Sequence, residues 1–233
     1  MGCGGMEVRP AIPTTPDPSL LMPGMPPSCQ AVPNTIAGMT AESGVTGGVT
    51  GGAPGGVTGK VRPITYYGED VLHRPCAEVT RDTPDLEQLV ADMFASMYAA
   101  HGVGLAANQI GVGLRIFVMD CPEEDDDGRS TGRSVVATLI NPVLHLPDGP
   151  RELVERTEGC LSVPGPTAVL ARAGEAHVHG FDLNWEPVTV HGTGLVARCL
   201  QHECDHLDGT VYVDRLAKRA RKQALAAADF SRE

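Results

Sequence analysis

The stretch TGLVARCLQHECDHLDG at residues 193–209 holds an H-E-x-x-H pattern, and its apolar spacing predicts a helix that ends at Gly209. At about 3.6 residues per turn, side chains four positions apart lie on one helix face, about 6 Å apart along the axis. His202 and His206 can therefore bind one metal ion, with Glu203 beside them and able to reach a water on that ion. A pattern with three fixed positions also arises by chance, so it does not settle the function alone.

A catalytic metal site usually has three protein ligands and keeps one position for water, so the two histidines leave one ligand to be found. In the larger class of zinc proteases the pattern continues to a third histidine, and Tyr212 occupies that position here. A later glutamate ligand is disfavoured, because the only glutamate after His206 is Glu233. We therefore expect the third ligand to come from an earlier part of the chain.

Three cysteines are candidates for this third ligand. Cys199 lies one turn before the first histidine and two turns before the second, about 10 Å along the axis from the latter, which is too far for a short side chain. Cys204 points to the opposite helix face. Cys160 stands in Glu-Gly-Cys-Leu-Ser at residues 158–162, where glycine allows close backbone approach. Its alternative role is that of a small buried apolar side chain, the usual role of a free cysteine.

A glycine-rich segment before the middle of the chain supplies the third pattern. Residues 102–109 read Gly-Val-Gly-Leu-Ala-Ala-Asn-Gln, as expected where a backbone must approach a substrate closely, although a plain turn would look similar. Together and in order, G-x-G-L-A-A-x-Q, E-G-C-L-S (158–162) and H-E-x-D-H-L-x-G (202–209) resemble the three signature motifs of peptide deformylases. The resemblance extends over about residues 62–216 and matches every fixed position.

This resemblance implies a metal-dependent hydrolase that removes the N-formyl group from the formylmethionine of newly made polypeptides and releases formate. Its implied metal ligands are Cys160, His202 and His206, around one divalent ion that is commonly iron(II), with zinc, nickel or cobalt as alternatives. Glu203 is implied as the group that takes a proton from the metal-bound water and delivers it to the leaving amine.

The resemblance also implies contacts to the substrate. The side chain of Gln109 and the backbone N–H of Leu161 would stabilise the charge that develops on the formyl oxygen. The backbone at Val103 and Gly104 would hydrogen-bond the peptide as a neighbouring strand does. An apolar pocket for methionine would have two walls, formed by Leu195 and Cys199.

Two positions depart from the family pattern. Thr167 stands where many family members have an arginine near the rim of the pocket, which puts the preference for substrate side chains in doubt. Arg198 stands where some relatives have an apolar pocket residue, and we expect its side chain to extend outward from the helix. Arg172, by contrast, is retained.

The composition changes sharply near residue 60. Residues 1–59 contain thirteen Gly and nine Pro and none of the nine aromatic residues, so we predict a disordered extension there and a catalytic domain at 60–233. In the domain, a helix is expected from an N-cap at Asp82 or Thr83 with Pro84 in its first turn, ending near Gly102.

The remaining patterns predict strands. Alternation marks residues 112–118, with Asp120 and Pro122 ending that strand; further strands are expected at 135–140, around 154 and at 176–183, the last paired with 188–190. The acidic run at 123–127 is interpreted as a solvated loop. Without strand–helix alternation, we predict an α+β fold in which antiparallel β-sheets pack around the central H-E-x-x-H helix, with one further N-terminal helix and a basic C-terminal helix at 216–233.

Charge and composition limit the partners. The formal net charge of −11 disfavours binding of DNA or RNA over the whole surface. Five cationic residues near the C-terminus favour a solvated helix end, with a local ribosome contact as the alternative (Arg215, Lys218, Arg219, Arg221 and Lys222). Seven scattered cysteines favour free thiols in a reducing compartment, and without an 18-residue apolar run or a secretion signal we expect a cytoplasmic protein that does not contact a membrane.

Two other functions remain open from the sequence. One is a metallopeptidase of the H-E-x-x-H type that cleaves internal amides, which Tyr212 and the missing downstream glutamate disfavour. The other is a catalytically silent, metal-stabilised binding module, which the presence of Glu203 and Gln109 disfavours because a purely structural metal site needs neither.

Overall fold

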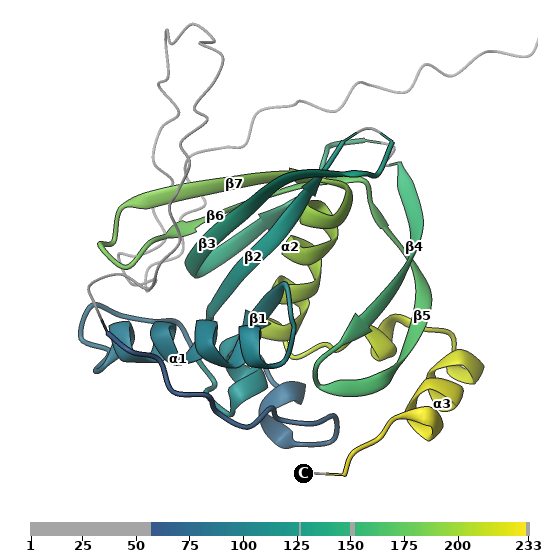
Figure 1. The fold of residues 1–233 in the computed structure, drawn as a ribbon, viewed down its shortest axis with the longest axis horizontal. Helices are drawn as coiled ribbons and strands as arrows, with labels where there is room; N and C mark the ends of the chain where they lie inside the picture. Colours follow the sequence, from purple (N-terminus) through teal and green to yellow (C-terminus); the bar gives the residue numbers. More distant parts are fainter. Residues whose placement is uncertain (1–56, 126, 150–151, 232–233) are drawn as a thin grey trace, which may run out of the picture. The chain divides into compact units, whose positions relative to one another are not determined.

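The computed structural model describes residues 57–231 except 126 and 150–151. In these residues the fold is α+β, with three α-helices and antiparallel sheets, as predicted (Figure 1). The helices are α1 (Leu86–Ala99), α2 (Gly194–Leu207) and α3 (Lys218–Ala227). The strands are β1 (Gly104–Ala106), β2 (Ile116–Glu124), β3 (Ser130–His145), β4 (Leu153–Cys160), β5 (Val163–Ala173), β6 (Glu175–Phe181) and β7 (Pro187–Thr193). None of the described helices is long and apolar enough to span a membrane.

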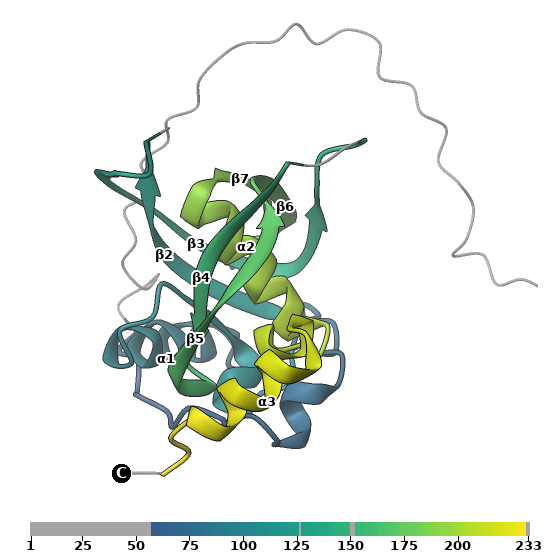
Figure 2. The ribbon, with the colours of Figure 1, turned by 90° about the vertical axis from the view of Figure 1, so that its right-hand side faces the viewer.

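The larger sheet has five strands in the order β1-β2-β3-β6-β7, and β4 and β5 form a separate two-stranded sheet. Because side chains alternate along a strand, the larger sheet presents two different faces. Phe117 and Leu139 pack with Leu200 of α2 on one face. Val118 and Ile140 point the other way and pack with α1 at the β1–β2 end of the sheet. The helix α2 therefore covers one face, while α1 covers part of the other (Figures 1 and 2).

The hairpin β4–β5 lies beside α2, and α3 packs against its strand β5 (Figure 2). Val163 at the start of β5 shares a small core with Val213 and with Ala224 of α3. Through these contacts the hairpin brings the end of β4, at Cys160, next to the helix that carries His202 and His206. The fold thus brings together two of the motifs that are far apart in the sequence.

Both ends of α2 are fixed by residues outside the helix. Glu124 at the end of β2 accepts a hydrogen bond of 3.0 Å from the backbone N–H of Leu195 and is also paired with Arg156 of β4. A carboxylate at a helix N-terminus satisfies free N–H groups and favours the helix dipole. At the other end, Gly209 has a φ of +78°, and a Cβ there would lie 2.7 Å from the backbone of Arg74. Only glycine fits that position without displacing the chain.

Several predicted boundaries are wrong. The first helix begins at Leu86 with Asp85 as its N-cap, so Asp82, Thr83 and Pro84 lie before it in turns, where the Thr83 hydroxyl accepts a hydrogen bond from the backbone N–H of Thr80. The strand β2 starts at Ile116, not at residue 112, and continues past Asp120 and Pro122, because its pairing with β3 runs on to Glu124.

The acidic run is also not wholly a solvated loop, since Glu124 ends β2 and is partly buried in its ion pair with Arg156. The strand β5 was not predicted, while the pairing of β6 with β7 is confirmed. The C-terminal helix is present but spans only Lys218–Ala227. Residues 1–56 of the predicted disordered extension lie outside the described residues. The described remainder, residues 57–59, contacts α1, where the carbonyl of Thr58 accepts a hydrogen bond from Gln88.

Candidate active site

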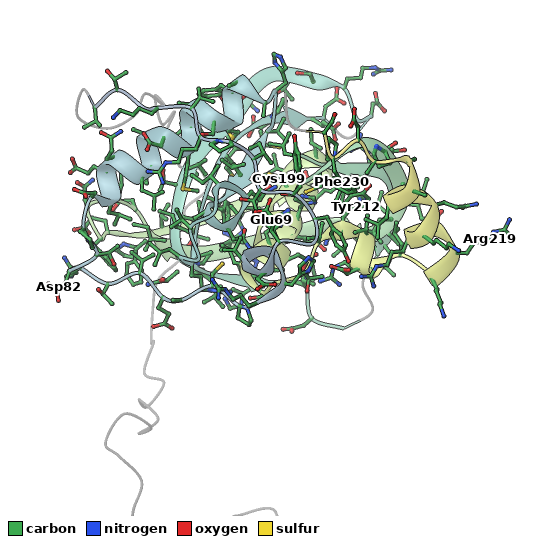
Figure 3. The ribbon with its side chains drawn as sticks, turned by 90° about the horizontal axis from the view of Figure 1, so that it is seen from below. Glu69, Asp82, Cys199, Tyr212, Arg219 and Phe230 are labelled. Carbon is green, nitrogen blue, oxygen red and sulfur yellow. The ribbon has the colours of Figure 1, made fainter. Side chains whose placement is uncertain are left out.

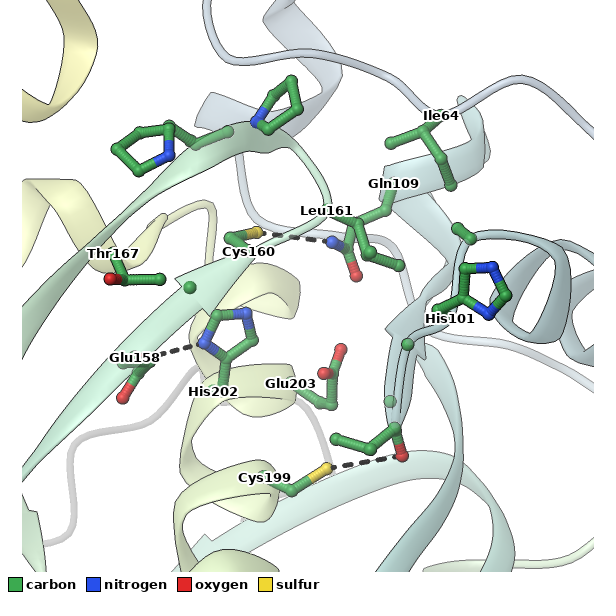
Figure 4. Close-up of a pocket in the computed structure, with 18 of the residues that line it drawn as sticks. Ile64, His101, Gln109, Glu158, Cys160, Leu161, Thr167, Cys199, His202 and Glu203 are labelled. Carbon is green, nitrogen blue, oxygen red and sulfur yellow. Dashed lines mark hydrogen bonds and ion pairs between the residues drawn. The ribbon is translucent and has the colours of Figure 1, made fainter. Parts of the chain in front are cut away.

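A cleft of about 600 Å³ lies between the β1 segment, the end of the β4–β5 hairpin and the helix α2. All three sequence motifs contribute to its walls, through the segment beginning at Gly102, the residues around Cys160, and the face of α2 with His202 and Glu203. Figure 4 shows Glu203, His202, Cys160 and Gln109 facing the same space from these different elements. The three motifs, far apart in the sequence, therefore converge on a single site.

Cys160, His202 and His206 lie close enough to share one metal ion. One ligand atom from each lies within 4.8 Å of those of the other two, and this is the one such group found among the described residues. The Sγ of Cys160 is 3.1 Å from the Nε2 of His206, and the two imidazole centroids are 4.9 Å apart. The structure places all three predicted ligands together, while Cys204 lies in the core on the other side of α2, as expected.

Glu158 holds the first of these imidazoles in place. Its Oε1 lies 2.7 Å from the Nδ1 of His202, which leaves the Nε2 of that ring for a metal ion (Figure 4). The same carboxylate pairs with Arg172 and Arg198, and all three side chains are buried. Burial alone would raise the pKa of Glu158, but hydrogen bonds from Arg172 and His202 outweigh it and hold that pKa well below its usual value.

Arg198 therefore does not extend outward, and that expectation is wrong. Its side chain is buried, and its guanidinium donates to Glu158 and to the backbone carbonyls of Val154 and Leu170. The reason is that the β4–β5 hairpin covers this part of α2 and supplies the three acceptors that the guanidinium binds. Arg198 thereby links the helix to the strand that ends at Cys160.

A second carboxylate extends this buried network. Asp205 pairs with Arg172 and with Arg215, so Arg215 of the C-terminal cationic run binds this network from the protein surface. Ion pairs in a buried network stabilise only when every partner is present, because removing one leaves a charge without compensation. The network fixes the position of the metal-ligand helix relative to the hairpin.

The charges around the two imidazoles favour a cation between them and the thiol. Burial lowers the pKa of His206 well below its usual range, so that ring is neutral, as a metal ligand must be. Burial acts in the same direction on His202, but hydrogen bonds to Cys160 and Glu158 outweigh it and raise the pKa well above its usual range. The raised pKa means that the surroundings of His202 stabilise a positive charge.

The residues present fit a divalent metal ion. A cysteine sulfur and two imidazoles form a donor set that zinc and iron accept. Two buried polar atoms beside this set, the Nδ1 of His206 and the Oε2 of Glu203, have no hydrogen-bond partner within the described part of the chain. Leaving such atoms without a hydrogen-bond partner costs free energy, so their presence beside the donor set points to a functional role.

Glu203 lies at the wall of the cleft with only 3% of its surface exposed. Burial raises its pKa to about 7, although the nearby charge of His202 opposes this shift. A carboxyl group with a pKa near neutrality can both accept and return a proton. Gly104 makes room for it, because a Cβ there would lie 2.5 Å from the Oε1 of Glu203 and 2.8 Å from the sulfur of Cys199.

Gln109 is buried and its amide is oriented by the backbone. The N–H of Ala106 donates to the amide oxygen of Gln109 at 2.9 Å, so the amide NH₂ group points the other way, toward the sulfur of Cys160 (3.5 Å) and the hydroxyl of Ser162 (3.3 Å). Leu161 follows Cys160 in the turn after β4 and lines the cleft. Both residues thus line the cleft beside Cys160.

The edge of β1 forms another wall of the cleft. In an antiparallel ladder the backbone polar groups of successive residues point to opposite edges. The carbonyl of Val103 accepts a hydrogen bond of 3.0 Å from the N–H of Asp120 in β2, so the N–H and C=O of the next residue, Gly104, point away from β2. Because β1 is an edge strand, this side of Gly104 faces the cleft.

The predicted pocket residues also line the cleft. Leu195 and Cys199 lie on α2, and the thiol of Cys199 is 3.9 Å from the carbonyl oxygen of Val103. Thr167 lies on β5 at the opposite side, exposed to solvent. Sequence reasoning gave no role to Glu158 or its arginine partners. The available signal was a carboxylate two residues before a candidate ligand, within one of the three motifs.

Comparisons with known proteins identify the family of this chain. The family model described as "Polypeptide deformylase" matches residues 61–222. The chain is 54% identical over 173 residues to peptide deformylase 2 of Streptomyces avermitilis (72% of this chain, 89% of the relative) and 48% identical over 172 residues to the peptide deformylase of Mycolicibacterium paratuberculosis (70% and 85%).

Solved structures give the same result. The crystal structure of peptide deformylase from Ehrlichia chaffeensis is similar with a TM-score of 0.64 and 38% identity, covering 72% of this chain and 94% of that one. A Met-Ala-Ser-bound crystal structure of a class I type b peptide deformylase from Acinetobacter baumannii is similar with a TM-score of 0.59 and 30% identity, covering 68% and 100%.

Proposed function

The chain belongs to the polypeptide deformylase family, and we propose that it works through one divalent metal ion held by Cys160, His202 and His206. Family membership establishes the activity, which is removal of the N-formyl group from nascent polypeptides, and it implies a divalent metal. The observation that carries our proposal is the convergence of one thiol and two imidazoles, with Cys160 and His202 at the wall of the cleft and His206 buried beside them.

The net reaction is hydrolysis of a formamide. Water adds to the formyl carbon, the C–N bond breaks, and the products are formate and a free amino terminus that takes up a proton. When bound, a divalent ion supplies Lewis acidity, which lowers the pKa of a coordinated water to near neutrality. The remaining requirements are a proton carrier, donors for the developing charge and a surface that aligns the peptide.

Glu203 is the proposed proton carrier. As the water attacks, the carboxylate accepts a proton, and it then delivers a proton to the nitrogen of the leaving amine. Its burial and a pKa near neutrality suit both steps, because neither proton transfer then runs strongly uphill.

Gln109 and Leu161 are the proposed donors to the formyl oxygen. As the formyl carbon becomes tetrahedral, this oxygen gains negative charge, and the amide NH₂ of Gln109 and the backbone N–H of Leu161 can donate to it. The hydrogen bond from Ala106 supports this role for Gln109, because it fixes the amide before the substrate arrives. One such donor is worth about 3 kcal/mol of transition-state stabilisation.

The peptide is proposed to bind along the edge of β1 as an added strand. The N–H and C=O of Gly104 would pair with its backbone, which gives affinity without regard to the peptide's sequence. Leu195 and Cys199 would contact the methionine side chain. The Met-Ala-Ser peptide in the Acinetobacter baumannii structure supports an N-terminal methionine as the residue bound. Thr167 at the exposed rim would set weaker preferences further along the peptide.

Three wider properties belong to the same proposal. Residues 60–233 form the catalytic domain, the extension before them takes no part in the chemistry, and the enzyme acts in the cytoplasm on newly made chains. The five cysteines of the described residues are all free thiols, which supports a reducing compartment. We propose iron(II) as the native metal, with zinc, nickel and cobalt as alternatives. Metal analysis of anaerobically purified protein tests this choice.

A ribosome contact through α3 is proposed with fewer cations than the sequence indicates. Arg215 is paired with Asp205 and Arg221 with Asp214, which leaves Lys218, Arg219 and Lys222 as the exposed cations of the run that form no ion pair within the described residues. Figure 3 shows Arg219 extending from α3 away from the neighbouring strands.

Because Ala224 of α3 is buried, removing the helix would disturb the core, and charge reversal is the better test. The variant K218E/R219E/K222E should lose sedimentation with ribosomes at low salt and keep its turnover of free formylated peptides. Unchanged sedimentation would refute the contact.

The metal proposal is tested by formate release from a formylmethionyl dipeptide together with metal content. Cys160→Ser should lose both the metal and the activity, whereas Cys76→Ser, which makes the same change in the core, should keep both. If Cys160→Ser keeps full activity, the proposed ligand set is wrong. An unformylated internal peptide in the same assay tests the metallopeptidase alternative, and we expect no cleavage.

A further inference from the structure

Four histidines that the deformylase reaction does not use lie together on the larger sheet. His145 on β3, His177 and His179 on β6, and His191 on β7 form what we term the outer histidine group. Their ring centroids lie 5.0 Å apart for His145–His177, 4.8 Å for His145–His179, 5.1 Å for His177–His179 and 5.0 Å for His177–His191. His177 contacts all three of the others and is the centre of the group.

Strand register brings these side chains together. His177 is directly opposite His145 on one neighbouring strand and His191 on the other. Side chains directly opposite each other in antiparallel strands lie on the same face, with Cβ atoms about 5 Å apart. His179 is two residues along from His177 and so lies on the same face. The group is therefore a consequence of backbone pairing.

The outer histidine group lies on the face opposite the catalytic helix. Val178 and Val190, which alternate with these histidines, are buried in the core that includes α2. The histidines must then point away from α2, and α1 covers this outer face only near Val118 and Ile140. His145, His179 and His191 are exposed and His177 is half-buried. The group is thus accessible and separate from the cleft.

The chemistry of the group is that of a ligand for transition metals. Neutral imidazole suits zinc, copper and nickel, and Glu175, two residues before His177 on the same face, adds a negative charge. Partial burial and then repulsion from the other three rings lower the pKa of His177, which keeps this ring neutral at physiological pH. The Nδ1 of His179 lies 2.7 Å from the hydroxyl of Thr189, which fixes that ring and leaves its Nε2 to bind.

We propose that the outer histidine group binds one divalent transition-metal ion, of the nickel, copper or zinc type, with His177 as the central ligand. The ring nitrogens have not converged in the way that those of the cleft have, so the exposed rings of His145 and His191 must turn to share an ion with His177 and His179. Exposed side chains are free to make this rotation. The ordering it requires makes the site weaker than the one in the cleft.

The test uses the full chain without a histidine tag. The protein is saturated with Ni²⁺, desalted so that only tightly held metal remains, and titrated again with Ni²⁺ by calorimetry at pH 7.5. The wild-type chain should take up one further ion per chain. The variant H177N/H191N should lose this second event, and H101N, which changes an exposed histidine elsewhere, should keep it.

Turnover of a formylated peptide is measured on the same samples. It should be equal in the wild type and in H177N/H191N, because the group lies outside the cleft, and normal turnover also shows that the variant has folded. A second event of unchanged size in H177N/H191N, or no second event in the wild type, would overturn the proposal. Neither result depends on how the cleft performs its reaction.

Discussion

The molecule contains two groups of histidines with almost the same spacing and very different surroundings. The rings of His202 and His206 are 4.9 Å apart in the cleft, and those of the outer histidine group are 4.8 to 5.1 Å apart on the sheet. The pair in the cleft is held by Glu158, joined by the thiol of Cys160 and bordered by Glu203. The outer group is surrounded largely by water. Ring spacing therefore does not distinguish a catalytic site from a surface site.

The distinguishing features are fixed orientation and a low local dielectric. A buried ion pair such as Glu158 with Arg172 keeps its geometry because both partners lack the alternative of bonding to water. Charges in such a site also act more strongly on one another than they do at the surface. Variants that remove these features one at a time should therefore lose activity or stability.

The largest effect should come from removing the proton carrier. Glu203→Gln keeps the shape of the side chain but cannot accept the proton, so kcat should fall by about 10²–10⁴-fold while metal content stays the same. Steady-state formate release and metal analysis measure the two quantities. The control is Glu175→Gln, which changes a carboxylate beside the outer histidine group and should leave kcat unaltered. Near-normal turnover of Glu203→Gln would contradict the assigned role.

Removing the carboxylate that orients His202 should make the cleft more like the surface group. Glu158→Gln leaves the buried Arg198 without a charge partner and Arg172 with Asp205 alone, so unfolding free energy should fall by about 3–5 kcal/mol. Metal affinity should fall by about 10–100-fold because the imidazole loses its hydrogen-bond partner. Glu155→Gln, an exposed change on the same strand, serves as the control in both chelator competition and denaturant unfolding. Equal metal affinity in the two variants would show that orientation by Glu158 is unimportant.

A methyl group at Gly104 should disturb the cleft without changing any ligand. The added Cβ would meet Glu203 and Cys199 and displace them, so kcat/KM in Gly104→Ala should fall on the order of 10²-fold while the chain stays folded. Gly113→Ala is the matched control, because the nearest atom to a Cβ there is 3.8 Å away. Comparable kcat/KM values in the two variants would mean that the close approach of β1 to Glu203 is not required.

The smallest effect is expected at the N-terminus of α2, the helix that carries His202 and His206. Hydrogen bonds from Arg156 hold the pKa of Glu124 below its ordinary value of 4.5, so the folded state favours the ionised form. The stability that this gives is present above that value and is lost as the pH falls through the lowered pKa. Glu124→Gln should thus reduce unfolding free energy by about 1 kcal/mol at pH 7, and the difference from wild type should shrink below pH 4.5. A difference that grows on acidification would contradict this reasoning.

The sequence predicted the residues that line the cleft better than it predicted the residues that hold them in position. His202 and His206 are four positions apart on one helix, so local geometry alone brings them together. Placing Cys160 needed the resemblance, because its approach to the helix depends on the β4–β5 hairpin. Arg198 was misjudged because its burial depends on that same hairpin, and β5 was not predicted. Contacts between segments far apart in the sequence leave no local period to detect.

The outer histidine group was not predicted from the sequence, because it also depends on contacts between segments that are far apart in the chain. His145 and His191 are far apart in the sequence and meet only because β6 lies between β3 and β7. Glu124 was assigned to a solvated loop because of its acidic neighbours. The pairing of β2 with β3 instead extends to Glu124 and places its carboxylate at the start of α2. In both cases strand register decides which side chains meet.

X-ray absorption at the metal edge of the iron- or zinc-loaded enzyme measures the proposed ligands themselves. For a zinc-loaded sample we expect one sulfur ligand at about 2.3 Å, with two imidazole nitrogens at about 2.0–2.1 Å and one oxygen completing the coordination. The sulfur signal should disappear in Cys160→Ser. A spectrum from the active enzyme with nitrogen and oxygen ligands alone would contradict the assignment of Cys160, and the proposed site would have to be abandoned.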